Sequence, residues 1–153
     1  MKEENSKNGG FSLVELIVVV LIMAVIATAL TLAVTKYVAK AKKSTDANVA
    51  GDLFGVAQKA TMDYIVKHGV LSPGDNAKVN TKTWTHSTPT ASPTFQEFIE
   101  YSIWRETGMH DIEAKVYPGK AFEIEVTCLG EDNIVYNVTY EGTNINPVLA
   151  ASN

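Results

Sequence analysis

The chain has 153 residues, of which 46% are hydrophobic, and this length allows one ordinary domain. Its formal net charge of -4 at pH 7 gives no reason to expect a nucleic acid as partner. The single cysteine, Cys128, excludes an intramolecular disulfide, so packing alone must hold the folded part together.

The chain begins with a short polar segment, residues 1–10, in which two lysines are balanced by two glutamates. A secretory signal combines a basic start, an apolar core of about 7–15 residues and small residues at a later cleavage site. Here the apolar run is longer and carries Glu15 in its first turn. The sequence therefore favours a leader, residues 1–10, that is cut before the apolar run.

The apolar run is long enough to cross a membrane. From Leu16 to Thr35 there are 20 residues without a charge, which as a helix measure about 30 Å, the hydrocarbon thickness of a bilayer. We predict a transmembrane helix over residues 11–35. Glu15 lies at its head, where a carboxylate costs about 2.5–3.5 kcal/mol on insertion scales, so it is expected to have a positive partner.

The junction between leader and apolar run reads Gly10-Phe11-Ser12-Leu13-Val14-Glu15. This pattern resembles the class III signal of type IV prepilins. The resemblance implies that an integral-membrane peptidase cuts between Gly10 and Phe11 and that the new amino terminus at Phe11 is N-methylated. It also implies that residues 11–35 form the core of a filament into which the amino-terminal helix polymerises, with further copies of the chain, the prepilin peptidase/methyltransferase and pilus assembly machinery as partners.

Cleavage after Gly10 would create an ammonium group at Phe11, one helical turn from Glu15. The family resemblance implies that Glu15 neutralises the amino terminus of a neighbouring subunit, and we prefer this intermolecular pairing to one within the helix. Assembly would then depend on Glu15, because an unpaired charge inside an apolar bundle is costly. The plainer alternative is a lipid-facing acid at the end of an ordinary anchor.

Four lysines come directly after the span, at Lys36, Lys40, Lys42 and Lys43. The positive-inside rule would place the carboxyl-terminal part of the chain in the cytoplasm. The resemblance implies the opposite, with the head outside the cell. We keep the orientation that the resemblance implies.

The helical pattern continues over residues 36–69, where apolar residues recur at steps of three and four. Lys67 and His68 suit a last turn, Gly69 suits a left-handed cap and Pro73 lies just beyond. One helix from about Phe11 to His68 is predicted.

A globular head is expected over residues 70–153. It comprises a loop at 70–93, a short helix at 94–107 that opens with the capping box of Thr94 and Glu97, a sheet at about 112–140 and a carboxyl-terminal tail. The strands are predicted at 112–117, 121–129 and 134–140. In the loop, Trp84 is either a plug over the core or an exposed binding aromatic, and we favour the plug.

The predicted fold class is α+β: a long amino-terminal helix with an apolar first half, packed by its second half against a small antiparallel sheet. This architecture is pilin-like, as the resemblance also implies.

Catalytic signals are weak, and we expect neither an enzyme nor a bound cofactor. No nucleophile motif surrounds a serine, and His68, His86 and His110 are scattered. His110, Asp111 and Glu113 are near in sequence, but adjacent ligands without a second set are weak evidence for a metal.

These observations predict a type IV pilin precursor, a single-pass membrane protein that ends in an extracellular pilus at the cell surface. A pseudopilin of a type II secretion or competence system shares the whole motif and stays open. A membrane-anchored monomeric binding protein is the alternative from another class. Adhesion, motility, DNA uptake and secretion all use this anchor, so the use of the filament stays open as well.

Overall fold

The computed structural model of the chain describes residues 10–84, 88–108, 111–130, 133–141 and 149–152, the last range in its backbone only. These ranges contain two helices, α1 (Leu13–His68) and α2 (Phe95–Glu106), and four strands. The strands are β1 (Asn76–Asn80), β2 (Phe122–Gly130), β3 (Asn133–Tyr140) and β4 (Leu149–Ser152). The chain divides into two compact units between Lys40 and Ala41, and the second unit contains the sheet.

Helix α1 begins at Leu13, two residues later than predicted, because Ser12 caps it. The helix ends at His68, and Gly69 follows with φ of +102°, a conformation that glycine adopts without steric cost. The Gly69 N–H donates to the carbonyl oxygen of Ile65 at 2.9 Å, which satisfies one of the last free carbonyls of the helix. Local sequence signals thus set both ends of α1.

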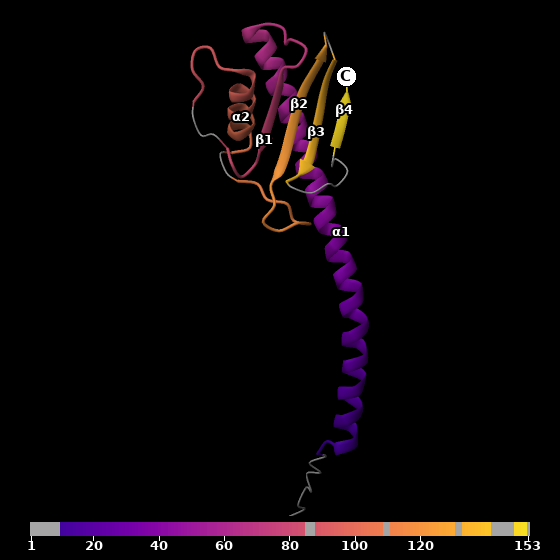
Figure 1. Cartoon of the computed structure of the whole chain (residues 1–153). Helices are drawn as coiled ribbons and strands as arrows, with labels where there is room; N and C mark the ends of the chain where they lie inside the picture. The colour runs from indigo at the N-terminus through magenta and orange to yellow at the C-terminus, as the bar shows by residue number, and fades with distance from the viewer. Residues whose placement is uncertain (1–9, 85–87, 109–110, 131–132, 142–148, 153) are drawn as a thin grey trace, which may run out of the picture. The chain divides into compact units, whose positions relative to one another are not determined.

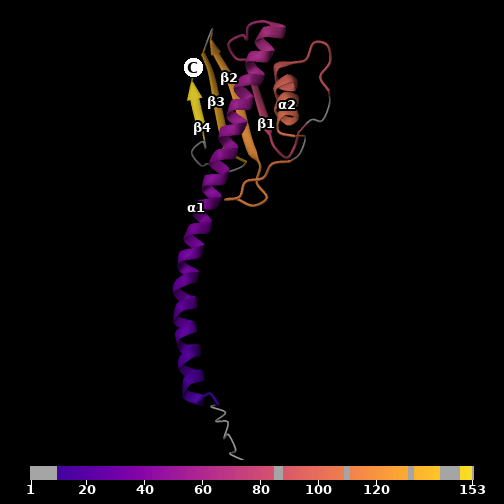
Figure 2. The ribbon, with the colours of Figure 1, turned by 180° about the vertical axis from the view of Figure 1, so that it is seen from behind.

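The sheet is antiparallel and its strands follow one another in the order β1-β2-β3-β4 (Figure 1). Ala77 of β1 faces Val126 of β2, and Ile124 of β2 faces Val138 of β3. Along β2 and β3 buried and more exposed residues alternate, so that one face of the sheet is apolar. Within the unit that begins at Ala41, both views show α1 running along this face and α2 lying beside β1 (Figures 1 and 2).

The strand predicted at 112–117 is wrong, since only an isolated bridge between Glu113 and Ala121 forms there. The buried Asp46 of α1 takes the backbone donors that a ladder would need. Its carboxylate accepts the N–H groups of Lys115 at 2.7 Å and Val116 at 2.9 Å. Burial, and next the nearby Asp46 carboxylate, raise the pKa of the Tyr140 hydroxyl.

Two strands were missed. The segment expected to be a loop at 70–93 contains β1, and the expected tail contains β4. In β1 only Ala77 and Val79 are buried, which is too short an alternation to stand out in the sequence. The outer edge of β1 is covered by α2, because the Gln96 amide accepts the Lys78 N–H at 2.7 Å and donates to its carbonyl oxygen at 2.8 Å. This contact protects an edge strand that would otherwise offer free backbone groups.

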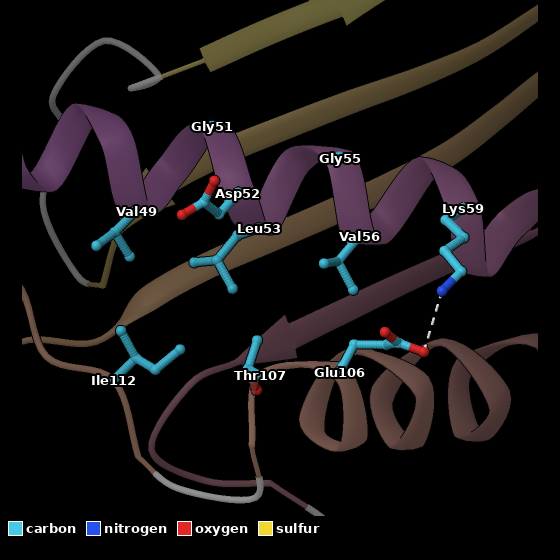
Figure 3. A pocket seen from close by; sticks show the side chains of 10 residues that line it. All are labelled: Val49, Gly51, Asp52, Leu53, Gly55, Val56, Lys59, Glu106, Thr107 and Ile112. Atoms are coloured by element: carbon cyan, nitrogen blue, oxygen red, sulfur yellow. Dashed lines mark hydrogen bonds and ion pairs between the residues drawn. The ribbon is translucent and has the colours of Figure 1, made fainter.

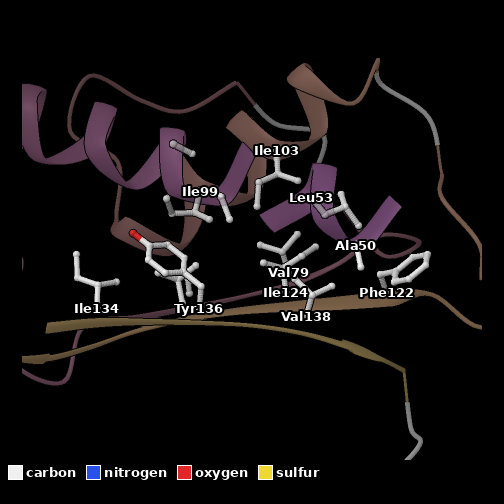
Figure 4. Packing of buried hydrophobic residues seen from close by; sticks show 14 of the residues in the cluster. Ala50, Leu53, Val79, Ile99, Ile103, Phe122, Ile124, Ile134, Tyr136 and Val138 are labelled. Carbon is white, nitrogen blue, oxygen red and sulfur yellow. The ribbon is translucent and has the colours of Figure 1, made fainter. Parts of the chain in front are cut away.

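The core lies between the apolar face of the sheet and the two helices (Figure 4). Leu53 of α1 and Ile99 of α2 point toward Ile124 and Val138 of the sheet (Figure 4). Packing of the second half of the long helix on the sheet is therefore confirmed. Trp84 is 7% exposed and belongs to the same cluster, which confirms the plug.

Candidate functional site

The predicted processing site lies immediately before α1. Gly10 and Phe11 are exposed, and the Phe11 side chain is 89% accessible. A side chain added at Gly10 would meet no atom within 4 Å. The fold of this chain therefore does not itself demand a glycine at position 10, and any such demand must come from a partner. The rest of the predicted leader, residues 1–9, lies outside the described residues.

Glu15 takes part in a local cap at the start of α1. Its Oε2 atom accepts the backbone N–H of Ser12 at 2.9 Å, and the Ser12 hydroxyl accepts the N–H of Val14 at 3.4 Å. Ser12 and Glu15 stand three residues apart, as in a capping box. The sequence analysis missed this role, although the Ser-x-x-Glu spacing was visible there.

The helix that follows Glu15 presents apolar side chains on all sides. Every residue from Leu13 to Lys40 is exposed. One window of α1 has a mean hydropathy of 3.0 with none of it buried, so by length and composition α1 is a candidate membrane span. In water such a surface would be very unfavourable, at about 25 cal/mol per Å² of exposed apolar area. Lipid or other helices must cover it.

Polar side chains within the apolar segment satisfy their own hydrogen bonds. The hydroxyls of Thr28, Thr31 and Thr35 donate to carbonyl oxygens three or four residues earlier, at 2.8, 2.8 and 3.1 Å. A hydroxyl bonded in this way leaves no free donor toward hydrocarbon. Glu15 differs from these threonines, because a charged carboxylate in an apolar segment needs a positive partner.

The lysines after the span are all exposed: Lys36, Lys40, Lys42 and Lys43. None of them forms an ion pair with another described residue. They are therefore free to contact lipid headgroups or acidic groups of another molecule.

An open groove of about 670 Å³ lies in the unit that begins at Ala41 (Figure 3). Val49, Leu53 and Val56 of α1 point into it, toward Ile112 and Thr107 on the other side (Figure 3). At one end Lys59 Nζ lies 3.2 Å from Glu106 Oε1, and this lysine lowers the pKa of the Glu106 carboxyl. Lys59 and Glu106 are thus paired with each other, whereas the Asp52 carboxylate, which also lines the groove, forms no ion pair with another described residue.

The residues considered for metal binding give no centre in the described part of the chain. His86 and His110 lie outside the described residues, and those that are described contain no group of three His, Cys, Asp or Glu side chains that could hold a metal ion. Cys128 is buried in the core, where its Sγ lies 3.4 Å from the carbonyl oxygen of Gly130.

Comparison with known proteins identifies the amino-terminal segment. Residues 5–31 match the family model of the prokaryotic N-terminal methylation motif, less than a fifth of the chain. This motif is the class III prepilin signal of type IV pilins and pseudopilins, so the resemblance found in the sequence is confirmed. No curated protein and no solved structure matches the chain significantly.

The motif supports a type IV pilin-like or pseudopilin precursor. That is a structural class of protein and not an enzyme class. The α+β layout, with a long apolar amino-terminal helix and a small antiparallel sheet, is the pilin-like one.

Proposed function

We propose that the chain is a type IV pilin precursor that is cut between Gly10 and Phe11, methylated at Phe11 and polymerised into an extracellular pilus. One observation carries the proposal: an apolar helix, exposed along its whole first half, opens with a motif that contains a single acid, Glu15. A prepilin peptidase/methyltransferase would process the membrane-bound precursor, and assembly machinery would extract it. The covering that the apolar surface requires would come first from lipid and then from the helices of other copies.

In this proposal Glu15 has two successive roles. In the isolated chain its carboxylate caps α1 through the Ser12 N–H. After cleavage, the new ammonium group at Phe11 supplies the positive partner, and in the filament that partner belongs to a neighbouring subunit. An ion pair buried among apolar helices favours addition in one register, because a misplaced subunit leaves both charges unpaired.

The first test is the intact mass and amino-terminal sequence of the protein recovered from cell surfaces. A chain that begins at Phe11 and is heavier by one methyl group is expected. A chain that begins at Met1, or one cut after the apolar run, would contradict the proposal and favour an ordinary anchor or signal peptide.

The second test separates the two roles of Glu15. Glu15→Gln keeps an oxygen that accepts the Ser12 N–H but removes the charge, whereas Glu15→Ala removes both. We expect both variants to reduce the yield of sheared filaments by more than about a hundredfold, because a buried charge without its partner costs about 3–5 kcal/mol. Glu125→Gln, at an exposed position of β2, is the matched control and should assemble normally.

Normal filaments from Glu15→Gln together with failure of Glu15→Ala would show that the cap, and not the ion pair, drives assembly. Correct processing at Phe11 without long surface filaments would instead favour a pseudopilin, which carries the same motif.

A further inference from the structure

A small pocket lies in the unit that begins at Ala41, further along α1 than the groove that Val49 and Ile112 line. It has a volume of about 270 Å³. The last turn of α1, residues 89–93 and one face of α2 form its walls. Pro89 and Pro93 stand in the wall that residues 89–93 form.

Aromatic rings pack around one side of this pocket. The rings of Tyr64 and His68 lie 4.9 Å apart, and the Phe98 ring lies 5.4 Å from Tyr64 and 5.6 Å from His68. Phe98 and Tyr101 of α2 line the pocket and are only partly buried. Part of their surface is thus available to a ligand.

Two cations border the same rings. Lys67 Nζ lies 5.4 Å from the centre of the Phe98 ring, and Arg105 Cζ lies 5.9 Å from the centre of the Tyr101 ring. Asp63 is the carboxylate among the lining residues. Permanent positive charge therefore exceeds negative charge in the lining.

The two cations differ in how far they are already paired within the chain. Lys67 forms none with any described residue. Arg105 Nη2 lies 3.5 Å from Glu106 Oε1, but that oxygen is held more closely by Lys59, at 3.2 Å. Most N–H donors of the Arg105 guanidinium group therefore stay available to a ligand. Two parallel N–H groups of this planar group can bind both oxygens of a carboxylate.

From this arrangement we infer that the pocket binds an acidic sugar, a pyranose ring that carries a carboxylate. The carboxylate would bond to Arg105 and Lys67, and the sugar ring would contact the parts of Phe98 and Tyr101 that these cations leave uncovered. The volume is close to the lower limit of about 300 Å³ for small-molecule sites, which suits a single sugar ring. This inference does not rest on filament formation.

A single-stranded nucleic acid fits the pocket less well. Such ligands need a basic groove that follows the backbone over roughly 4–16 nucleotides, with aromatic rings for successive bases. The pocket offers two cations within a short concavity, on a chain whose net charge is -4. A ligand with one negative charge matches this lining better than a polyanion.

The experiment uses the full chain in detergent, with sodium glucuronate as the probe and glucose as its neutral counterpart. Saturation-transfer NMR should show transfer to glucuronate and little to glucose. Arg105→Gln and Lys67→Gln should each weaken glucuronate binding at least tenfold, with thermal unfolding unchanged. Lys120→Gln, which removes an exposed cation outside the pocket lining, should leave binding intact.

Arg105→Lys keeps the positive charge but loses the paired N–H groups of the guanidinium. It should weaken glucuronate binding by about threefold or more. Equal binding of glucose and glucuronate, or equal affinity in the wild type and Arg105→Gln, would overturn the inference. So would tighter binding of a thymidine oligonucleotide that both glutamine variants abolish, since the pocket would then be a nucleic-acid site.

Discussion

Helix α1 contains two segments that differ in whether their apolar residues are buried within the chain. From Leu13 to Lys40 the helix is strongly apolar and every residue is exposed. From Ala41 onward it is more polar, yet it buries a stripe of six residues: Asp46, Ala50, Leu53, Ala57, Ala60 and Thr61. Apolar content alone thus does not tell which part of a helix is buried within its own chain. The second segment finds its partner surface in the same chain, whereas the first requires lipid or another molecule.

The sharpest way to test this contrast is to truncate one leucine in each segment. Leu53 is 1% exposed, and Leu53→Ala should lower the free energy of unfolding of the sheet-containing unit by about 2–5 kcal/mol through lost burial and a cavity. Leu21 is 61% exposed, and Leu21→Ala should leave that unfolding free energy unchanged. Chemical denaturation of the full chain in detergent measures both, and equal effects would contradict the contrast.

A charge placed in the first segment tests its need for an apolar environment. Val25→Lys should disfavour membrane insertion by about 2.5–3.5 kcal/mol, since a lysine near the centre of a span is poorly solvated. Val66→Lys, at a position that is 85% exposed, is the control and should insert normally. The readout is the fraction of chains integrated into membranes, and unimpaired integration of Val25→Lys would argue against a spanning segment.

Asp46 shows how the second segment is bound to its surroundings. Asp46→Asn keeps only one acceptor oxygen for the two N–H groups of Lys115 and Val116, and it should lower the free energy of unfolding by about 1–3 kcal/mol. Asp52 is exposed on the same helix, and Asp52→Asn should have an effect within about 0.5 kcal/mol of zero. Thermal unfolding compares the two variants. If Asp46→Asn is as stable as the wild type, this contact does not stabilise the fold.

The smallest effect concerns the two helix starts, which carry the same Ser/Thr-x-x-Glu spacing. At α2, hydrogen bonds from the backbone and side chain of Thr94 lower the pKa of Glu97 below its ordinary value of 4.5. A carboxyl group with a lowered folded-state pKa stabilises the fold above the ordinary pKa, and this contribution is lost as pH falls through the lowered value. The melting temperature should therefore fall slightly more on acidification below pH 4.5 in the wild type than in Glu97→Gln. If the melting temperatures of the wild type and of Glu97→Gln fall equally with pH, this role of Glu97 is contradicted.

Several elements were predictable because their signals are local. The stop signals at His68 and Gly69, the capping box of α2 and the alternation in β2 each depend on neighbours within a few residues. The amino-terminal motif is local in the same sense, and its recognition in the sequence agrees with the family match over residues 5–31. The cap formed by Ser12 and Glu15 was equally local and could have been found.

The errors about the strands have a common physical origin in partners that are distant in sequence. Asp46 lies 69 positions from Lys115, so nothing near residues 112–117 showed that their backbone donors were already used. In the same way β1 is a strand because β2 pairs with it and Gln96 covers its outer edge. The pocket bordered by Lys67 and Arg105 likewise joins side chains of two helices, α1 and α2.

The sequence by itself determined the length of the uncharged run, the isolation of Glu15 at its head and the Gly10-Phe11 junction of the motif, because the order of residues along the chain fixes all three. It also determined which residues of β2 face the core, since side chains alternate along any strand. Only the tertiary structure decided where Asp46 finds its hydrogen bonds, which segments pair as strands and which cations border the aromatic pocket. These outcomes depend on packing between distant segments, and a local pattern carries no information about which distant groups will meet.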